Sequence, residues 1–263
     1  MKNNELKILT IGNSFSVDTM EHVASIAKNL GINKIKLGNL YVGGCSITQH
    51  HCFLAEQKPV YTYYQNDGFG WSVTEGVKSS DALDSEAWDY VTIQPGTGDG
   101  SRHTDEKSYE KLLPLLESVK SRIPLDTKVA FNLTWVGEPT CTHHEISSYG
   151  GDQLLLLSKI IEMVKTVVCP LKEVDFIIPT GVAIQNARTA TKEILTRDNF
   201  HLSYDKGRYI AGLTFFSKIT GISIDTVTWA PDGVDENFRK IAIKAVNDAL
   251  KNPFSITKCD IKD

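Results

Sequence analysis

Short apolar segments alternate with longer segments of helical periodicity along most of the chain. Five runs rich in Ile, Leu and Val have the length of a buried strand. Between and after them, hydrophobic residues recur every three or four positions, which is typical of amphipathic helices. The expected strands are residues 7–11, 35–42, 88–93, 128–133 and 174–178, and the expected helices are residues 18–30, 106–119, 152–168, 205–219 and 235–250.

This alternation of strands and helices predicts a parallel sheet with helices on both faces. The sequence has no internal repeat and no linker, so we expect a single domain over residues 1–263. Its architecture is predicted to be three-layer α/β/α, with a mainly parallel five-stranded sheet. Residues 50–86 have weak periodicity and many aromatic residues, and we interpret them as an insertion that could include a lid. Asp18 and Glu21 resemble a capping box at the start of the first helix.

The composition excludes several classes of partner. The chain has 263 residues, of which 41% are hydrophobic and 23% charged, and its net charge is -4. No basic cluster indicates a nucleic acid or a membrane surface as partner, and no apolar run is long enough to cross a bilayer. If Met1 is the native start, we expect a cytoplasmic protein, because the first strand leaves no room for a signal peptide. A removed leader would instead indicate a periplasmic or secreted protein.

Neither the cysteines nor the histidines favour a metal site or a disulfide framework. The cysteines are odd in number and scattered, without a CxxC pair. They are Cys45, Cys52, Cys141, Cys169 and Cys259. The pairs His50–His51 and His143–His144 lack HExxH spacing, so we expect surface histidines and no metal. His143 or His144 could still line the mouth of a crevice, since both follow the fourth expected strand.

In a doubly wound sheet the functional crevice lies outside the carboxyl ends of the strands. The loop after the first expected strand reads Gly12-Asn13-Ser14-Phe15-Ser16 and leads directly into a helical segment. A serine at a helix N-terminus, where free N–H groups favour negative charge, is a candidate nucleophile. The same position could bind phosphate, but a single glycine matches neither phosphate-loop pattern, and the loop also fails GxSxG. Taken alone, the loop is more typical of a structural turn.

Three other loops carry candidate chemistry. Gly43 and Gly44 follow the second strand, and paired glycines allow backbone N–H groups to approach a ligand, although a tight turn would also need them. Gln94 directly follows the third strand, where its amide could point into the crevice as a donor or cap the loop. Asp198 and His201 are three residues apart and precede a helix. The carboxylate could accept from Nδ1–H and leave Nε2 to take a proton from a serine.

Together these loops could supply a nucleophile, oxyanion donors, a base and an orienting acid. The blocks GNSFS, GNLYVGGCS and LTRDNFHLS resemble the conserved blocks of the SGNH/GDSL hydrolase superfamily. The likeness is greatest to a bacterial branch that carries GNSFS instead of GDSL, and it runs from about Lys7 to Gly221. It implies a flavodoxin-like α/β/α domain that hydrolyses esters, often acetyl or other acyl groups on carbohydrates or small molecules.

Position by position, the resemblance implies Ser14 as the nucleophile, His201 as the general base and Asp198 as the residue that orients it. The backbone N–H groups of Ser14 and Gly44 would be oxyanion donors. No cofactor is implied, and the substrate would be a small-molecule or glycan ester cleaved through an acyl-enzyme.

The block that follows the third expected strand departs from the superfamily pattern. The superfamily has Gly-x-Asn-Asp, whose Asn completes the oxyanion hole, whereas the sequence GTGD places Gly98 at the Asn position. We expect Gln94 to replace that donor, because a carboxamide stands at the end of the same strand. Losing one such donor typically costs about two to three orders of magnitude in rate.

Asn13, Asn186 and Arg188 are candidate substrate contacts. For Asn186 and Arg188 the alternative is a helix whose polar residues hydrogen-bond the loop before Asp198. The aromatic residues of positions 61–71 could stack on sugar rings or fill the core of the insertion. Two other functions stay open: a catalytically weak carbohydrate-binding protein on the same fold, and a phosphate or nucleotide binder. The sequence does not indicate the oligomeric state.

Overall fold

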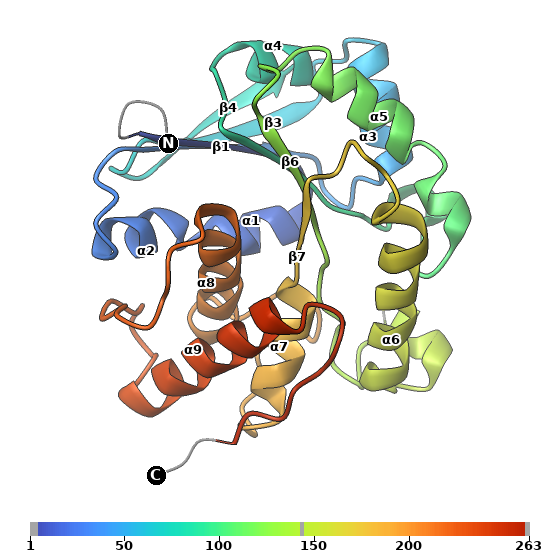
Figure 1. The fold of residues 1–263 in the computed structure, drawn as a ribbon. Helices are drawn as coiled ribbons and strands as arrows, with labels where there is room; N and C mark the ends of the chain where they lie inside the picture. The colour runs from blue at the N-terminus through green and yellow to red at the C-terminus, as the bar shows by residue number, and fades with distance from the viewer. Residues whose placement is uncertain (1–4, 143–144, 261–263) are drawn as a thin grey trace. The chain divides into compact units, whose positions relative to one another are not determined.

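The computed structural model describes residues 5–142 and 145–260, which fold into two compact units. Unit 1 comprises residues 1–17, 32–132 and 162–177, and unit 2 comprises residues 18–31, 133–161 and 178–263. The chain passes between the units after residues 31 and 132 and within α1 (Ser14–Met20), α6 (Gln153–Met163) and β7 (Phe176–Ile178), which are labelled in Figure 1. Each unit therefore combines segments that are distant in the sequence.

Unit 1 is built on a seven-stranded sheet of order β4-β3-β2-β1-β5-β6-β7. The strands β1 (Leu6–Gly12), β2 (Ile35–Tyr41), β5 (Tyr90–Ile93) and β6 (Lys128–Asn132) pair in parallel. An antiparallel hairpin of β3 (Tyr61–Asn66) and β4 (Trp71–Val77) continues the sheet beyond β2. Apart from Lys7, all residues of β1 are buried, which explains why the sequence reads there as an almost continuous apolar run.

The predicted α/β class with a mainly parallel sheet is confirmed, but the predicted count of five strands is wrong. The two additional strands lie within residues 50–86, where the sequence pattern is weak. The reason is visible in β4, whose five central residues are all exposed, so that they do not alternate between apolar and polar. In β3, the aromatic residues Tyr61 and Tyr63 are buried. Residues 61–77 thus extend the sheet at its edge.

The helices of unit 1 include α3 (Ile47–Ala55), α4 (Ser79–Asp84) and α5 (Leu112–Lys120), and α3 packs against α5 (Figure 1). The helix predicted over 106–119 is divided into a 3₁₀ turn at Glu106–Tyr109 and α5. In α5, Leu112, Leu115, Leu116 and Val119 are buried, at the spacing of an amphipathic helix, whereas Leu113 is exposed. After α6, a π-helical segment at Val164–Val168 completes the helix predicted over 152–168.

Unit 2 is mainly helical. Its helices include α2 (Val23–Asn29), α7 (Thr180–Arg188), α8 (Lys206–Thr220) and α9 (Glu236–Lys251), with a 3₁₀ turn at Glu145–Tyr149. Helices α7, α8 and α9 pack on one another, and α2 packs on α8 (Figure 1). The hydrophobic periodicity did not predict α7, and a helix at Asn186 and Arg188 entered only as the alternative to their role as substrate contacts. Seven of its residues after Thr180 are also buried, including the polar Gln185 and Asn186, so α7 has no apolar stripe facing away from a polar one.

The first predicted helix differs from the observed one. Residues 18–30 were expected to form one helix capped by Asp18 and Glu21, but α1 already begins at Ser14 and ends at Met20, and α2 follows from Val23. Asp18 is therefore inside a helix and fully buried, and the capping-box interpretation is wrong. Across the two described ranges, no helix has both the length and the apolar character needed to cross a bilayer.

Candidate active site

Three loops at the carboxyl ends of β1, β2 and β5 are joined by the side chain of Asn13. Its Nδ2 donates to the carbonyl oxygens of Cys45 and Pro95, both at 3.1 Å. Its Oδ1 accepts from Gln94 Nε2 at 2.9 Å and from the backbone N–H of Phe15 at 3.1 Å. One buried carboxamide thus connects the three loops of unit 1 in which the sequence placed candidate chemistry.

The two serines of GNSFS have different environments. Ser14 is the first residue of α1 and is half-buried. Ser16 is fully buried, with its hydroxyl 2.7 Å from the carbonyl oxygen of Asn13 and 2.8 Å from the Oδ1 atom of Asn39. A Cβ atom at Gly12 would lie 2.7 Å from the hydroxyl of Ser16, so the turn requires glycine. Of the two hydroxyls, that of Ser14 is the better candidate to meet a substrate.

Close backbone contact joins the loops after β2 and β5. Gly98 N–H donates to the carbonyl oxygen of Gly44 at 2.6 Å, and a Cβ atom at Gly96 would overlap with the carbonyl oxygen of Cys45. Gly44 has a φ of +65°, in the left-handed region that favours glycine. Its own N–H has no acceptor among the residues that the structure describes. This N–H is available as a donor to a ligand.

Gln94, which is 1% exposed, is hydrogen-bonded to Asn13. Its Nε2 donates to Asn13, and its Oε1 has no hydrogen-bond partner within the described parts of the chain. The sequence predicted a donor that points into a crevice. Because an amide nitrogen carries two N–H groups and one is used by Asn13, only the second could serve that purpose.

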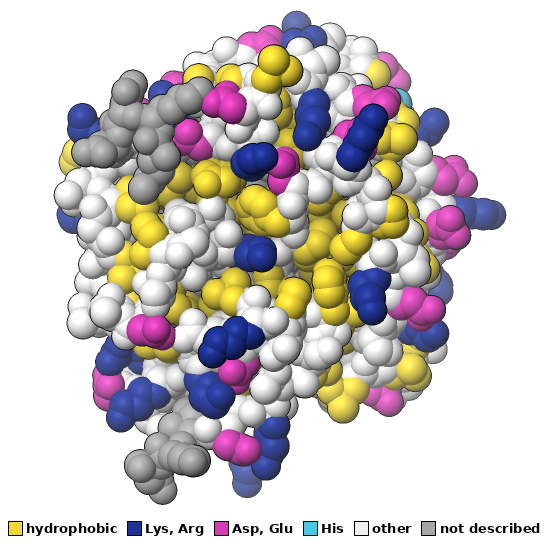
Figure 2. Space-filling view, in the orientation of Figure 1, with side chains coloured by type: hydrophobic (Ala, Val, Ile, Leu, Met, Phe, Trp, Pro, Cys, Tyr) yellow, Lys and Arg dark blue, Asp and Glu magenta, His cyan; other side chains and the backbone are white. Residues whose placement is uncertain are grey.

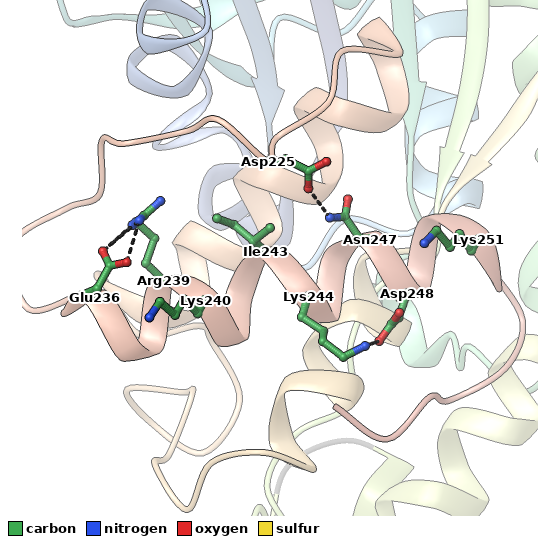
Figure 3. Close-up of a pocket in the computed structure, with 9 residues that line it drawn as sticks. All are labelled: Asp225, Glu236, Arg239, Lys240, Ile243, Lys244, Asn247, Asp248 and Lys251. Carbon is green, nitrogen blue, oxygen red and sulfur yellow. Dashed lines mark hydrogen bonds and ion pairs between the residues drawn. The ribbon is translucent and has the colours of Figure 1, made fainter. Parts of the chain in front are cut away.

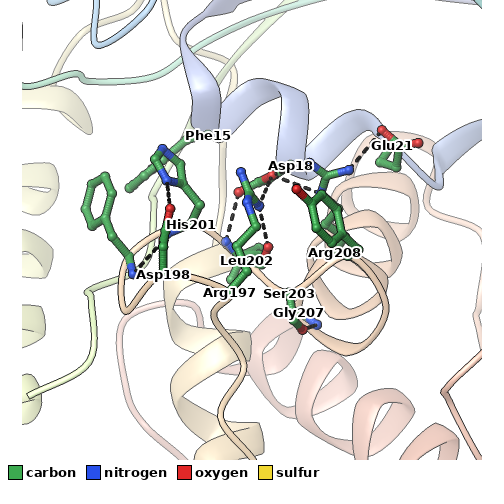
Figure 4. Close-up of polar contacts among 12 residues, drawn as sticks. Phe15, Asp18, Glu21, Arg197, Asp198, His201, Leu202, Ser203, Gly207 and Arg208 are labelled. Carbon is green, nitrogen blue, oxygen red and sulfur yellow. Dashed lines mark hydrogen bonds and ion pairs between the residues drawn. The ribbon is translucent and has the colours of Figure 1, made fainter. Parts of the chain in front are cut away.

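In unit 2, Asp198 and His201 form a hydrogen-bonded pair in a tight hairpin closed by the bridge between Thr196 and Leu202. His201 Nδ1 lies 2.6 Å from Asp198 Oδ2 (Figure 4). The other carboxylate oxygen, Oδ1, accepts the backbone N–H groups of Phe200 at 3.1 Å and of His201 at 2.7 Å. The acid is thus held by three hydrogen bonds within its own hairpin.

The electrostatics of this pair suit an acid that orients a base. Partial burial raises the pKa of Asp198, but hydrogen bonds from the ring and backbone of His201 and from Phe200 N–H outweigh it and hold the pKa below its ordinary value. Asp198 therefore stays ionised at neutral pH. With Nδ1 bound to the carboxylate, the ring would exchange protons through Nε2. The side chains of His201 and Asp198 are 27% and 49% exposed, so solvent reaches the pair.

A second group of contacts supports the hairpin from the segment that follows β6. Trp135 Nε1 donates to the carbonyl oxygen of Phe200 at 2.9 Å, and Glu138 N–H donates to that of Asn199 at 2.7 Å. The Glu138 carboxylate in turn pairs with Arg188 at 2.8 Å and accepts from the Thr196 hydroxyl at 3.2 Å. Both ends of the hairpin are therefore tied to the body of unit 2.

The three proposed substrate contacts make protein contacts instead of lining an open surface. Asn186 is fully buried, donating to the carbonyl oxygen of Ala245 at 3.2 Å and accepting from Thr257 N–H at 2.7 Å. Arg188 is bound to Glu138, and Asn13 joins the loops of unit 1. For Arg188 the contacts favour the alternative interpretation, in which a polar helix residue supports the segment before Asp198.

The histidines outside the hairpin have separate surroundings. His50 is fully buried in α3, where its Nδ1 lies 2.8 Å from the hydroxyl of Tyr61, and burial lowers its pKa to about 3. It is therefore not the surface histidine that the sequence suggested. His143 and His144 lie outside the described residues. Among the residues that are described, no three His, Cys, Asp or Glu side chains are grouped to hold a metal ion.

The surface drawn in Figure 2 has no large region of only positive or only negative side chains, because Lys and Arg are interspersed with Asp and Glu. A groove along α9 shows the same mixture (Figure 3). Arg239 in this groove pairs with Glu236 at 2.8 Å, and Lys244 pairs with Asp248 at 2.7 Å. Two of the cations in the groove are thus paired with adjacent carboxylates, and Lys240 and Lys251 also line it.

The sequence and the fold are similar to those of known proteins. A family model described as "Domain of unknown function (DUF4886)" matches residues 7–249. A search of curated proteins found no match. A crystal structure of a DUF4886 family protein from Bacteroides uniformis ATCC 8492 is similar, with 29% identity, a TM-score of 0.89 and coverage of 97% of this chain and 98% of that chain.

A more distant similarity concerns the fold. The crystal structure of a member of the lipolytic protein G-D-S-L family from Veillonella parvula DSM 2008 matches with a TM-score of 0.53. The identity is 13%, and the match covers 82% of this chain and all of that chain. At this identity the similarity shows the fold alone, which is the one that the GNSFS resemblance implied.

Proposed function

The chain belongs to the DUF4886 family, and from this premise we propose that it is a serine hydrolase of the SGNH kind that cleaves carboxylic esters. The observation that carries the proposal is the Asp198–His201 pair, in which an ionised carboxylate meets Nδ1 of a partly exposed imidazole at 2.6 Å. The GDSL-type fold supports it, as does the half-buried Ser14 at the start of a helix.

In the proposed reaction, the Ser14 hydroxyl attacks the ester carbonyl while His201 Nε2 accepts its proton. His201 then protonates the leaving alcohol, and an acyl-Ser14 intermediate remains. Water, deprotonated by the same nitrogen, hydrolyses this intermediate and restores the serine. Asp198 stabilises the imidazolium that forms in each step and keeps the proton of the resting ring on Nδ1. No metal or organic cofactor enters this scheme.

The tetrahedral oxyanion needs hydrogen-bond donors that are already in place. We assign the backbone N–H groups of Ser14 and Gly44 to this role, and the second N–H of Gln94 Nε2 as a third donor. The assignment of Gly44 is supported by its N–H, which has no acceptor in the described parts of the chain, and by its left-handed conformation. The side chain of Gln94 is buried and already donates one N–H to Asn13, so only its second N–H would reach the oxyanion.

The acyl group that we propose is short, acetyl or similar, on a small molecule or a carbohydrate. This part rests on the resemblance of the sequence blocks to SGNH hydrolases. A carbohydrate-binding protein of low catalytic activity is the second candidate. One observation favours it. Gly98 stands where the superfamily has its oxyanion Asn, so the loop after β5 has no side-chain donor at that position. The backbone N–H of Gly98 is already bonded to the carbonyl oxygen of Gly44.

The experiment measures hydrolysis of p-nitrophenyl acetate and labelling by a fluorophosphonate in the wild type, Ser14→Ala and Ser121→Ala. Ser121 is an exposed serine at the end of α5 and serves as the control. We expect Ser14→Ala to lose the label and at least about 10³-fold in kcat, with an unchanged melting temperature, while Ser121→Ala behaves as the wild type. Wild-type labelling and turnover in Ser14→Ala would refute the nucleophile. A wild type without turnover that is stabilised by sugars would favour the second candidate.

A further inference from the structure

Asp18, whose side chain the proposed mechanism does not use, is a buried carboxylate at the centre of a charged cluster in unit 2. Its Oδ1 accepts from Arg197 Nη1 and from Arg208 Nε, each at 2.9 Å. Its Oδ2 accepts the backbone N–H of Leu202 at 2.8 Å (Figure 4). Arg208 also reaches Glu21 at 3.2 Å. A buried carboxylate is normally retained only with such partners, because taking it out of water unpaired is very costly.

Asp18 contacts the residues that come directly before and directly after the Asp198–His201 segment in the sequence. Arg197 immediately precedes Asp198, and Leu202 immediately follows His201. The backbone N–H of Arg197 donates to the carbonyl oxygen of His201 at 2.9 Å, and its side chain donates to that of Leu202. The peptide group between His201 and Leu202 is thus held at its oxygen by Arg197 and at its nitrogen by Asp18. The backbone from which the imidazole projects has little freedom to move.

Asp18 also lies in the same helix as the proposed nucleophile. Ser14 is the first residue of α1, and Asp18 follows four residues later. Residues four apart in an α-helix project from the same face. The carboxylate that holds the hairpin therefore belongs to the helix that begins with the proposed nucleophile.

We propose that Asp18, acting through Arg197 and the Leu202 N–H, is a positioning residue that fixes the backbone of the Asp198–His201 hairpin within unit 2. The inference rests on the proposed function. Catalysis by proton transfer depends steeply on the placement of the base, and a displacement of about 1 Å can cost about 10²-fold in rate. Substrate binding depends much less on this nitrogen. Loosening the anchor should therefore lower kcat and leave KM nearly unchanged.

The test compares Asp18→Asn, Arg197→Lys and a control, Asp248→Asn. Asp248 is a largely buried carboxylate of unit 2 that pairs with Lys244 on α9 and makes no contact with the hairpin. We expect Asp18→Asn and Arg197→Lys to lower kcat for p-nitrophenyl acetate by about 10- to 100-fold, with KM within about twofold of the wild type. The control should keep the wild-type kcat even though it loses an ion pair.

A readout that does not need turnover separates positioning from general destabilisation. The His201 proton on Nδ1, bonded to Asp198, should give a downfield proton NMR signal that is absent in His201→Gln. We expect this signal to broaden or vanish in Asp18→Asn at a temperature where the variant is folded, and to persist in Asp248→Asn. If Asp18→Asn does not fold, Arg197→Lys carries the test, because Arg197 is partly exposed.

The outcomes distinguish this inference from the proposed function. Wild-type kcat together with an unchanged Nδ1 signal in Asp18→Asn and Arg197→Lys would overturn the positioning role while leaving the hydrolase standing. A wild type that neither hydrolyses the ester nor reacts with fluorophosphonate would refute the hydrolase. In that case the NMR signal alone decides whether Asp18 fixes the hairpin. An equal fall in kcat in Asp248→Asn would also overturn the inference.

Discussion

Replacing Asp198 by asparagine removes the charge of the proposed orienting acid with almost no change in shape. The Asn side-chain oxygen can still accept the backbone N–H groups that Oδ1 accepts now, so the hairpin should keep its conformation. Its NH₂ group would then face His201 Nδ1, where the wild type has an acceptor at 2.6 Å. A donor at this position selects the tautomer with the proton on Nε2, and that nitrogen can no longer take a proton from Ser14.

The expected fall in kcat depends on the role of Asp198 as the orienting acid and on the solvent exposure of the Asp198–His201 pair. In a serine protease, the same exchange at a buried orienting Asp lowers kcat by about 10⁴-fold. Asp198 is 49% exposed, so water can replace part of its stabilising effect on the imidazolium. We therefore expect a fall of about 10³-fold in kcat, which corresponds to about 4 kcal/mol of transition-state stabilisation.

The assay is kcat and KM for p-nitrophenyl acetate between pH 5 and pH 9, together with thermal unfolding. Asp84→Asn is the control, because Asp84 has a similar exposed fraction and pairs only with Arg122 in the described chain. We expect nearly equal melting temperatures for the three proteins and a loss of rate in Asp198→Asn alone. A kcat within twofold of the wild type at every pH would show that Asp198 does not orient the base.

Two further predictions concern unit 1. Gln94→Ala should lower kcat by about 100- to 1000-fold with little change in KM, because it removes both the third proposed donor and the bond to Asn13. An unchanged kcat would remove Gln94 from the oxyanion hole. His50→Phe should flatten the dependence of stability on pH: the pKa of His50 is about 3 in the folded state and 6.5 when unfolded, so the unfolded state binds the extra proton between these values. Stability therefore falls as the pH falls through this window, by about 2 kcal/mol at pH 5. Urea unfolding at pH 7 and pH 5 measures it, and equal losses in wild type and variant would contradict the assignment.

The sequence predicted the parts of the fold in which burial is uniform or strictly periodic. Strand β1 is apolar because it is buried on both faces, and α5 shows its apolar stripe every three to four residues. The edge strand β4 could not be predicted in this way. Its central residues are exposed, so apolar and polar residues do not alternate along it. Helix α7 was missed for the opposite reason, since it buries polar and small residues together and their partners lie far along the chain.

The same distinction applies to the candidate site. Asp198 and His201 could be paired from the sequence because they are three positions apart, and the structure shows their hydrogen bond. Asp18 could not be linked to Arg197 or Arg208, which lie 179 and 190 residues away. The sequence offered only a local interpretation of Asp18 as a helix cap. A carboxylate near a helix start has several possible partners, and only three-dimensional contacts select among them.

The hydrogen bonds of Asn13 explain why an amide, and not an acid, follows Gly12 in the sequence GNSFS. The nitrogen of this side chain faces two carbonyl oxygens, and its oxygen faces two N–H groups. An aspartate in its place would direct a carboxylate oxygen at two electronegative atoms, which repel it. The chemical identity of residue 13 is therefore set by the way in which the three neighbouring loops are bonded together, independently of acid–base chemistry.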